Sequence, residues 1–438
     1  MAYDNHGLSI STASETAAAH YRAGATLMLA AWPGAAERFD AAIADDPEFA
    51  LARAARARLH ALSAQPAEAR VQIAEAGRLV VLNGTERERS HVDVLTLALT
   101  NQPNQALVGA LAHLDHWPRD TVILSLPLGA FGLFAFSGMV DHDQARVDLC
   151  ERHASQFSAD DWWFLTYRGW SLAENGEVPR GRAMLERAYA LRAENANGVH
   201  ALAHALFEAG ASDDADKLIA DWLPSYDRSG LLHGHISWHA ALIALERGDA
   251  EGALAIYANQ IQPSVSKSMP INVVTDGASL LWRIRAYGHE APDSLWQDIA
   301  DYADRSFPKA GRAFIDTHML IIAAATANST ALEQRVADLD ALVKSGALGA
   351  GAVVPAIGRA VSAFANGNAA ECVRLLEPVA SEVVRIGGSG AQRELIEDTL
   401  LVALMRSGET KKARALLDRR LHRRPSPRDM RWLNQLAA

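Results

Sequence analysis

The stretch GAAERFDAAIADDP, from Gly34 to Pro47, places small and aromatic residues at the spacing of one packed helix. Ala35, Phe39 and Ala42 follow one another at intervals of four and three residues, so they share one helix face. Pro47 comes twelve residues after Ala35 and cannot continue the helix. Small residues let a neighbouring helix approach closely. The stretch therefore predicts the second helix of a helical hairpin.

The same marks recur along the chain. At five further positions a glycine, which suits a tight turn, is followed five residues later by a small residue. The first two of these glycines are 34 residues apart, which is the length of a tetratricopeptide repeat. Pro425 stands twelve residues after the last small position. The pairs are Gly176 and Gly181, Gly210 and Ala215, Gly248 and Ala253, Gly367 and Cys372, and Gly408 and Ala413.

Between these marks, alanine is abundant and apolar residues recur every three or four positions, which favours amphipathic helices. We expect an all-α, tetratricopeptide-like α-solenoid of about ten helical hairpins, whose superhelix has a concave pocket. Residues 1–11 are expected to be a flexible N-terminus, and residues 12–438 a single helical-repeat domain. Gly, Pro and Ser predict surface loops at residues 263–276 and 345–358.

The composition limits the classes of function. With 49% hydrophobic and 21% charged residues in 438, the chain can bury a core. Its net charge of −10 gives no electrostatic reason to expect nucleic-acid binding. Cys150 and Cys372 stand far apart, which favours a reducing compartment, and we expect the cytoplasm. The uncharged segment 121–140 has the length of a membrane span, but Pro127 and three glycines favour a buried helix of a soluble protein without a membrane partner.

Histidines form the main candidate site. His200 and His204 stand four residues apart, and His235 and His239 repeat this spacing 35 residues later. Residues four apart point to the same side of a helix. Each pair precedes a turn glycine, so we expect the pairs on the first helices of neighbouring hairpins, which line the concave face. The four imidazoles are therefore predicted to converge.

Further polar and aromatic residues are expected on the same concave face, where they would complete a pocket with carboxylates and an aromatic wall. The catalytic candidates are His200, His204, His235, His239, Asp276, Asp316 and His318. The substrate-binding candidates are Trp163, Tyr167, Glu208, Trp238, Gln392 and Arg393.

Three uses of such a pocket are open. Neutral imidazoles bind zinc, iron or manganese, and the two histidine pairs are the candidate ligands of a divalent metal ion. A histidine oriented by Asp276 or Asp316 can instead act as general base or acid. The groups can also hold a polar or anionic ligand. The structural alternative is a set of imidazoles that are satisfied as buried packing.

Two other segments bring charge to a helix end. IGGSGAQRE, residues 386–394, enters a helix that carries Arg393, and it either cradles an anion or uses Ser389 as the helix cap. We favour the cap. The C-terminal run RRLHRRPSPRDMRW lies on the last hairpin, where we expect exposed basic side chains that keep the end of the solenoid in solution. Its arginines include Arg419, Arg420, Arg423 and Arg424.

The chain resembles the tetratricopeptide repeat protein 38 family. The resemblance lies in HALAHALFE, HISWHAALIALERGDAEGALAIY, DGASLLWRI, DTHMLIIA and GGSGAQRELIEDTLLVAL, in this order between about residues 196 and 404. It implies a helical-repeat fold and supplies no reaction. The family pattern falls on His200, His204, Glu208, His235, Trp238, His239, Asp276, Ser279, Asp316, His318, Gln392 and Arg393.

Two functions remain open from the sequence. The first is a small-molecule-binding protein whose His/Asp-rich site is that of an enzyme, a hydrolase or a lyase that uses proton transfer or a metal ion. The alternative is a non-catalytic scaffold that binds a protein or peptide in its groove. A small-molecule ligand is the partner expected of the first, and a homo-oligomer or a protein partner stays open in both.

Overall fold

Residues 2–436, which the computed structural model describes, fold into twenty-three α-helices with one short β-hairpin. The strands are β1 (Ala2–Tyr3) and β2 (Ser9–Ile10). The α-helices are α1 (Glu15–Leu29), α2 (Ala35–Asp45), α3 (Ala50–Leu62), α4 (Pro66–Asn83), α5 (Glu86–Leu99), α6 (Pro103–His116), α7 (Thr121–Leu128), α8 (His142–His153), α9 (Trp162–Glu174), α10 (Val178–Leu191), α11 (Ala196–Glu208), α12 (Ser212–Trp222), α13 (His233–Arg247), α14 (Ala250–Ile256), α15 (Pro270–Ala286), α16 (Asp293–Ser306), α17 (Ala313–Ala325), α18 (Ser329–Lys344), α19 (Val353–Ala365), α20 (Ala369–Leu376), α21 (Gly390–Arg406), α22 (Thr410–Arg423) and α23 (Pro427–Gln435). Short η segments are η1 (Ala135–Ser137), η2 (Ala154–Gln156), η3 (Leu223–Ser225), η4 (Tyr257–Ile261) and η5 (Glu377–Ile386).

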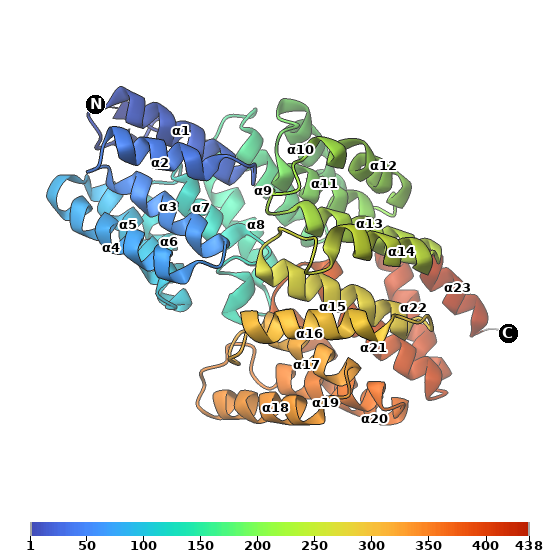
Figure 1. Cartoon of the computed structure of the whole chain (residues 1–438). Helices are drawn as coiled ribbons and strands as arrows, with labels where there is room; N and C mark the ends of the chain where they lie inside the picture. The colour runs from blue at the N-terminus through green and yellow to red at the C-terminus, as the bar shows by residue number, and fades with distance from the viewer. Residues whose placement is uncertain (1, 437–438) are drawn as a thin grey trace.

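Consecutive helices pair into ten hairpins in the described chain, from α1 with α2 to α21 with α22, and α23 follows the last pair (Figure 1). The exceptions are α7, which packs on α6, and α8, which packs on α9. The first helix of a pair is the inner one: fourteen of the seventeen residues of α15 are buried, against three of fourteen in α16. The core therefore lies between the two helices of each pair and between neighbouring inner helices. The predicted all-α, tetratricopeptide-like solenoid of about ten hairpins is confirmed.

The turn glycines and small residues have the predicted roles. Gly176, Gly210, Gly248, Gly367 and Gly408 all adopt positive φ, between 73° and 94°, which only glycine adopts without strain. The small residue that follows each of them is buried where two helices cross. At Gly181 a Cβ atom would lie 2.4 Å from the carbonyl oxygen of Gly169, so the α9 and α10 backbones touch.

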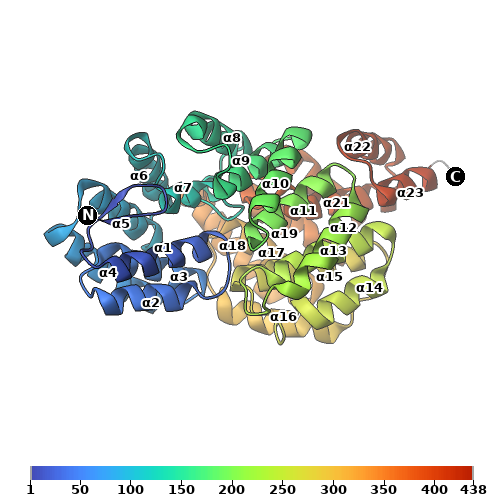
Figure 2. The same ribbon diagram turned by 90° about the horizontal axis from the view of Figure 1, so that it is seen from above.

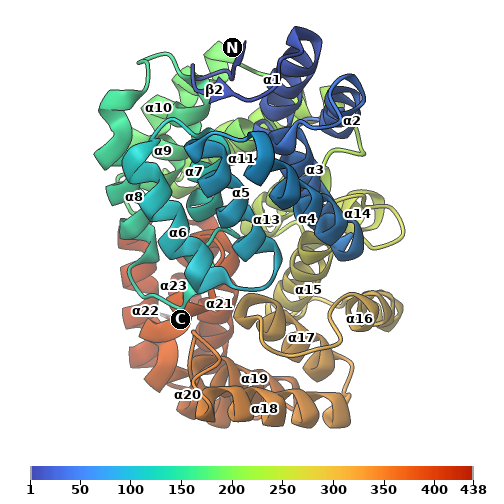
Figure 3. The same cartoon turned by 90° about the vertical axis from the view of Figure 1, so that its left-hand side faces the viewer.

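The superhelix closes on itself. Figure 2 shows the arm of α1–α6 on one side and α11–α15 on the other, and Figure 3 shows α18–α20 at the end opposite α1 and α2. From that end the chain returns, so that α23 packs against α13 and α21 against α15. Arg424, after α22, lies 3.2 Å from the carboxylate of Glu208 in α11, and Arg393 of α21 lies 2.7 Å from Asp143 in α8.

This closure corrects the expectation for the C-terminal arginines. Arg420 and Arg424 are buried, 2% and 4% exposed, and both contact Glu394. Arg419 and Arg423 are exposed as expected. The prediction was wrong for the first two because a solenoid that returns on itself buries its last hairpin against earlier ones.

Several segment boundaries also differ from the sequence expectation. The region 263–276 is loop only as far as Met269, because Pro270 opens α15 at a position where a proline fits a helix. In the same way 345–358 is loop up to Ala352, and α19 follows. The segment 121–140 gives the short helix α7, then loop and η1. Among the described helices, none combines the length and apolarity needed to cross a membrane.

The first described residues form a short hairpin, and their flexibility stays a prediction. Of residues 1–11, expected to be flexible, Ala2–Tyr3 and Ser9–Ile10 pair as antiparallel strands. Arg87 of α5 donates to the carbonyl oxygen of Ser9 and lies 3.5 Å from Asp4, while Ile10 is 1% exposed. These contacts hold the hairpin against the first three helix pairs.

A four-histidine candidate metal centre

Two inner helices bring the histidine pairs together. The side chain of Asn195 accepts from the Gly198 backbone and starts α11, which carries His200 and His204. The neighbouring helix α13 carries His235 and His239. One ring nitrogen from each of the four imidazoles lies within 4.8 Å of all the others. The predicted convergence of the four rings is therefore present in the structure.

Three of the rings meet through their Nε2 atoms. His200 Nε2 lies 3.0 Å from His204 Nε2 and 3.0 Å from His235 Nε2. Each of these two partners has a carboxylate behind its other nitrogen: Glu174 Oε1 lies 2.9 Å from His204 Nδ1, and Asp276 Oδ2 lies 2.8 Å from His235 Nδ1. The hydrogen bond from His235 Nδ1 to Asp276 fixes the proton there and leaves His235 Nε2 with a free lone pair. At His204 the contact with Glu174 is a close approach of charge rather than a hydrogen bond, and the negative charge favours the same tautomer.

This arrangement fits a metal ion. The Nε2 lone pairs of His204 and His235 then both face the Nε2 of His200. That nitrogen carries at most one proton, so it can donate a hydrogen bond to only one of the two lone pairs. Two nitrogens that bind one zinc ion at its usual bond length and tetrahedral angle lie ~3.3 Å apart, close to the spacing here. His239 offers a fourth metal ligand. Its Nε2 is buried and has no hydrogen-bond partner within residues 2–436, and its ring centre lies 4.3 Å from that of His204.

The electrostatics favour neutral rings. Burial, together with the neighbouring imidazoles, lowers the pKa of His200 and His239 well below the usual value. Burial raises the pKa of Glu174, but the His204 imidazole outweighs this effect and the net shift is downward. At neutral pH the two histidines are therefore unprotonated and Glu174 is ionised. Both are the protonation states that a metal centre needs.

Trp238 packs against one of the four histidines. Its ring stacks on His235, with ring centres 5.4 Å apart and planes within 12°, and its Nε1 donates to Ser279 Oγ at 3.0 Å. It is fully buried. Trp238 therefore fixes the plane of the His235 ring, and its role in substrate binding stays a prediction.

A cavity of about 490 Å³ opens beside the four histidines. It is the concave interior of the superhelix, because its walls come from odd-numbered helices between α1 and α15, together with the loops that join them. His200 and His235 reach its wall, and so does Tyr167. Trp163 does not: it is 1% exposed and packs behind Tyr167 with ring centres 5.0 Å apart.

Asp316 and His318 are committed elsewhere. Asp316 accepts from the backbone of Gly311 and Arg312 and lies 2.6 Å from Arg335. His318 Nδ1 donates to the carbonyl oxygen of Phe314, one turn back in α17, and burial lowers its pKa to about 4. The structure does not bring either residue into the four-histidine group, so their catalytic role stays a prediction.

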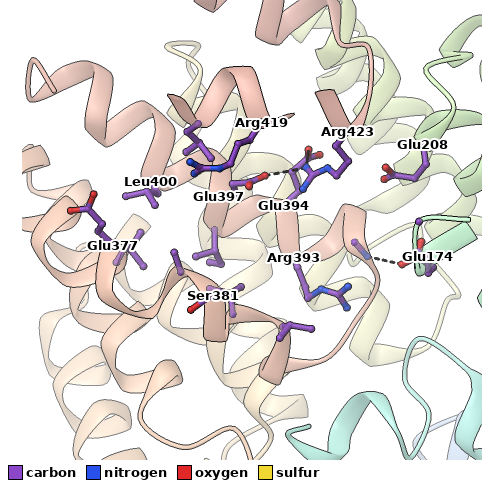
Figure 4. Close-up of a pocket in the computed structure, with 18 of the residues that line it drawn as sticks. Glu174, Glu208, Glu377, Ser381, Arg393, Glu394, Glu397, Leu400, Arg419 and Arg423 are labelled. Atoms are coloured by element: carbon purple, nitrogen blue, oxygen red, sulfur yellow. Dashed lines mark hydrogen bonds and ion pairs between the residues drawn. The ribbon is translucent and has the colours of Figure 1, made fainter. Parts of the chain in front are cut away.

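A larger cavity of about 780 Å³ lies at the C-terminal end of α9 (Figure 4). Glu208 and Arg393 line it, together with further charged residues of α21 and α22. Gln392 instead forms a capping box with Ser389, so the cap interpretation of the glycine-rich segment is confirmed. Glu174 connects the two sites, because its second oxygen accepts from the Gly390 backbone at 2.7 Å in the wall of this cavity.

A second histidine cluster, not expected from the sequence, is structural. His91 Nδ1, His113 Nε2 and Arg87 Nη1 all converge on one oxygen of Asp120, at 2.9, 3.3 and 2.7 Å. Burial raises the pKa of Asp120, but the pull of His91 and Arg87 leaves it well below the usual value. Because the arginine already occupies that oxygen, the cluster serves to hold the N-terminal hairpin through Arg87.

Sequence reasoning missed Glu174, although a signal was present. Tyr167, Trp170 and Glu174 are spaced by three and four residues, so they form one stripe along α9 that faces α11. Asn272 and Arg58 were also missed. Both line the smaller cavity, and Asn272 donates toward Asp276 at 3.4 Å.

A scan against protein-family models finds no match. Solved structures that resemble the chain include the Naa15/Naa10 complex bound to HypK (12% identity, 92% of this chain and 62% of that one, TM-score 0.26). Others are yeast Tom70 (14%, 91% and 82%, TM-score 0.31) and the P58(IPK) TPR domain (14%, 90% and 99%, TM-score 0.21). This chain thus spans less than two thirds of the first. At such identities and TM-scores these likenesses carry no argument about what the chain does.

Proposed function

We propose that the chain is a metal-dependent enzyme of the helical-repeat type, in which the two histidine pairs bind one divalent ion beside a small-molecule cavity. The observation that carries the proposal is the meeting of three Nε2 atoms at 3.0 Å, with a carboxylate behind two of the rings. Carboxylates in this position orient imidazole ligands and raise their basicity.

The coordination number decides whether such an ion can do chemistry. Four imidazoles complete the tetrahedral shell of zinc, which would then be structural. Iron or manganese accepts more ligands and would keep positions for water or substrate. These free coordination positions would face the cavity of about 490 Å³, whose wall includes His200 and His235. We therefore favour iron or manganese over zinc, and metal-assisted hydrolysis or elimination as the reaction class.

In this proposal the side chains have distinct roles. Glu174 and Asp276 hold the rings of His204 and His235 in place, so Asp276 has the orienting role expected of it. Tyr167, in the cavity wall, contacts the substrate. Membership of the tetratricopeptide repeat protein 38 family and a cytoplasmic location are parts of the same proposal, supported by the motif series and by two buried cysteines that are unpaired in the described chain.

Elemental analysis tests the metal centre. The purified protein should contain about one transition-metal ion per chain, and His204→Ala or His239→Ala should lose it while the helical circular dichroism remains. His289→Ala is the matched control, because His289 is exposed and outside the cluster. A protein that carries no metal and gains no thermal stability from added Fe²⁺, Mn²⁺ or Zn²⁺ would contradict the proposal.

A scaffold is the second candidate. Helical-repeat solenoids commonly present an extended concave surface to a peptide or protein. The larger cavity favours this function, since it is lined by both acidic and basic side chains, as a charged peptide requires (Figure 4). Under this proposal Glu377→Gln and Arg419→Gln, at two exposed positions in the cavity wall, would abolish capture of a protein partner, whereas loss of the four histidines would leave it unchanged.

A further inference from the structure

The smaller cavity has an unusual charge for this chain. Although the chain has a net charge of −10, the described residues place no aspartate or glutamate in the wall of this cavity. Its charged side chains are Arg58 and Arg312, and its titratable groups are Tyr167, His200 and His235. Burial keeps His200 neutral by lowering its pKa. The cavity is therefore positive inside an acidic protein.

Arg58 is a half-buried cation without a counter-ion. It stands on α3, and its Nη1 donates to the backbone carbonyl of Val122 at 2.8 Å. No carboxylate within residues 2–436 forms an ion pair with it. Burial lowers its pKa, so the charged form is held at a cost. An anion in the cavity would lower that cost, because a paired buried charge is more stable than an isolated one.

Arg312 adds a second free cation at the mouth. It stands just before α17, where its backbone amide is held by Asp316 while the residue itself is exposed. Within the described chain its guanidinium, too, lacks a carboxylate partner. A guanidinium offers several donors in a planar fork, which suits a carboxylate or phosphate group.

The rest of the wall is mostly apolar. It includes side chains from both arms of the superhelix, from α1, α3, α5 and α7 on one arm and from the loops before α13 and α15 on the other. The volume of about 490 Å³ lies within the range of small-molecule sites. Among the apolar lining residues are Met28, Leu62, Leu99, Phe131, Trp170 and Leu232.

We infer that this cavity binds an organic anion with an apolar body, whose acidic group is attracted by the positive charges of Arg58 and Arg312. The inference rests on the proposed function in taking the cavity as the substrate site, and it names the class of that substrate: a carboxylate or phosphate ester with a hydrocarbon or aromatic part. The bond to be cleaved would lie near His200 and His235, on the far side of the cavity from the arm that carries Arg58.

Calorimetric titration with four probes of equal chain length tests the inference: octanoate, octyl phosphate, octan-1-ol and octylammonium. At least one of the two anions should bind ten times more tightly than octan-1-ol, and octylammonium should bind most weakly. Octanoate and octyl phosphate in parallel identify the acidic group. Equal affinity for octan-1-ol and both anions would overturn the inference.

Two variants locate the anion. Arg58→Met removes the guanidinium group but keeps an unbranched apolar side chain, and it should weaken binding of the preferred anion at least fivefold. Arg312→Met should do the same in part, and because Arg312 is exposed this variant should fold even if the first does not. Arg359→Met is the control, since Arg359 pairs with Asp340 on an outer surface. If both variants fold and neither weakens anion binding, the inference is wrong.

The metal content is measured separately, so the two proposals can fail independently. Titration of the chelator-treated protein should still show selectivity for the anion, because the arginines do not depend on the ion. Selectivity in a protein that never carries metal would keep the anion site and remove the metal-dependent chemistry. Metal binding without selectivity would keep the four-histidine centre and overturn the anion site.

Discussion

The carboxylate behind His204 offers a selective test of the metal centre, because it can be changed without touching a ligand. Glu174 Oε1 lies 2.9 Å from His204 Nδ1, and its Oε2 accepts from the Gly390 amide at 2.7 Å. Glu174→Gln keeps the shape and an oxygen for Gly390. It places a neutral NH₂ donor against Nδ1, which pushes the ring proton to Nε2 and blocks the atom that would bind metal.

The expected loss can be estimated. Loss of a carboxylate that orients an imidazole ligand lowers metal affinity by roughly 10- to 100-fold, which is ~1.4–2.7 kcal/mol. The low pKa of Glu174 means that its charge is present at neutral pH, so the whole effect should appear there. At pH 7.5, competition between the protein and a chromophoric chelator for Zn²⁺ or Fe²⁺ measures it directly.

Glu177→Gln serves as the control for this experiment. Glu177 is exposed and contacts Arg180, so its loss should change metal affinity less than twofold. Thermal unfolding of the metal-free Glu174→Gln protein shows whether the fold survives. A folded Glu174→Gln protein with wild-type metal affinity would refute the reasoning, since the ring of His204 would then need no carboxylate to present its lone pair.

Three further measurements follow from the contacts. The pKa of His200 and His239 is lowered in the folded protein, so the unfolded state binds more protons than the folded state below about pH 6.5. The stability of the metal-free protein should therefore fall by ~1.4 kcal/mol for each of the two histidines between pH 7.5 and 5.5. Denaturant titration at several pH values measures this, and a stability that does not change with pH would show that the rings are already charged. Gly181→Ala should destabilise by about 1–3 kcal/mol because its Cβ would meet the Gly169 backbone, whereas Gly77→Ala, on open helix surface, should stabilise by ~0.5–1 kcal/mol in the same urea melts. Arg420→Met removes a buried cation that contacts Glu394, Asp398 and Asp429, and it should cost about 3–5 kcal/mol, against less than ~0.5 kcal/mol for exposed Arg419→Met. Equal effects on the melting temperature would contradict the closed superhelix.

The fold could be predicted because its signals are local. A glycine turn, a small residue five positions later and a proline at the end each act within one hairpin. Gly176 and Gly181 illustrate this: the first adopts a φ of 94°, and the second lets two helix backbones touch. The histidine pairs were predictable for the same reason, since a spacing of four residues determines which helix face they share.

Long-range packing could not be predicted in the same way. Within the run Arg420 has one partner, Asp429, but its partners Glu394 and Asp398, which bury it against an earlier helix, stand more than twenty residues away in sequence. Asp316 and His318 show the same limit, and their catalytic role stays a prediction. Their position on an inner helix suggested the pocket, but Arg335 and a backbone carbonyl supply their partners.

The closure of the superhelix and the candidate site depend on each other. Local sequence places His204 on the correct helix face, but the carboxylate that orients its ring is held by Gly390, which stands 216 residues after Glu174 at the start of α21. Gly390 can reach Glu174 only when the last hairpins have returned against the middle of the chain. A change that loosens this return, such as Arg420→Met, should therefore weaken metal binding as well as stability, although Arg420 contacts none of the four histidines. If the chain were only a scaffold and its histidines bound no metal, Arg420→Met would change stability without changing metal binding.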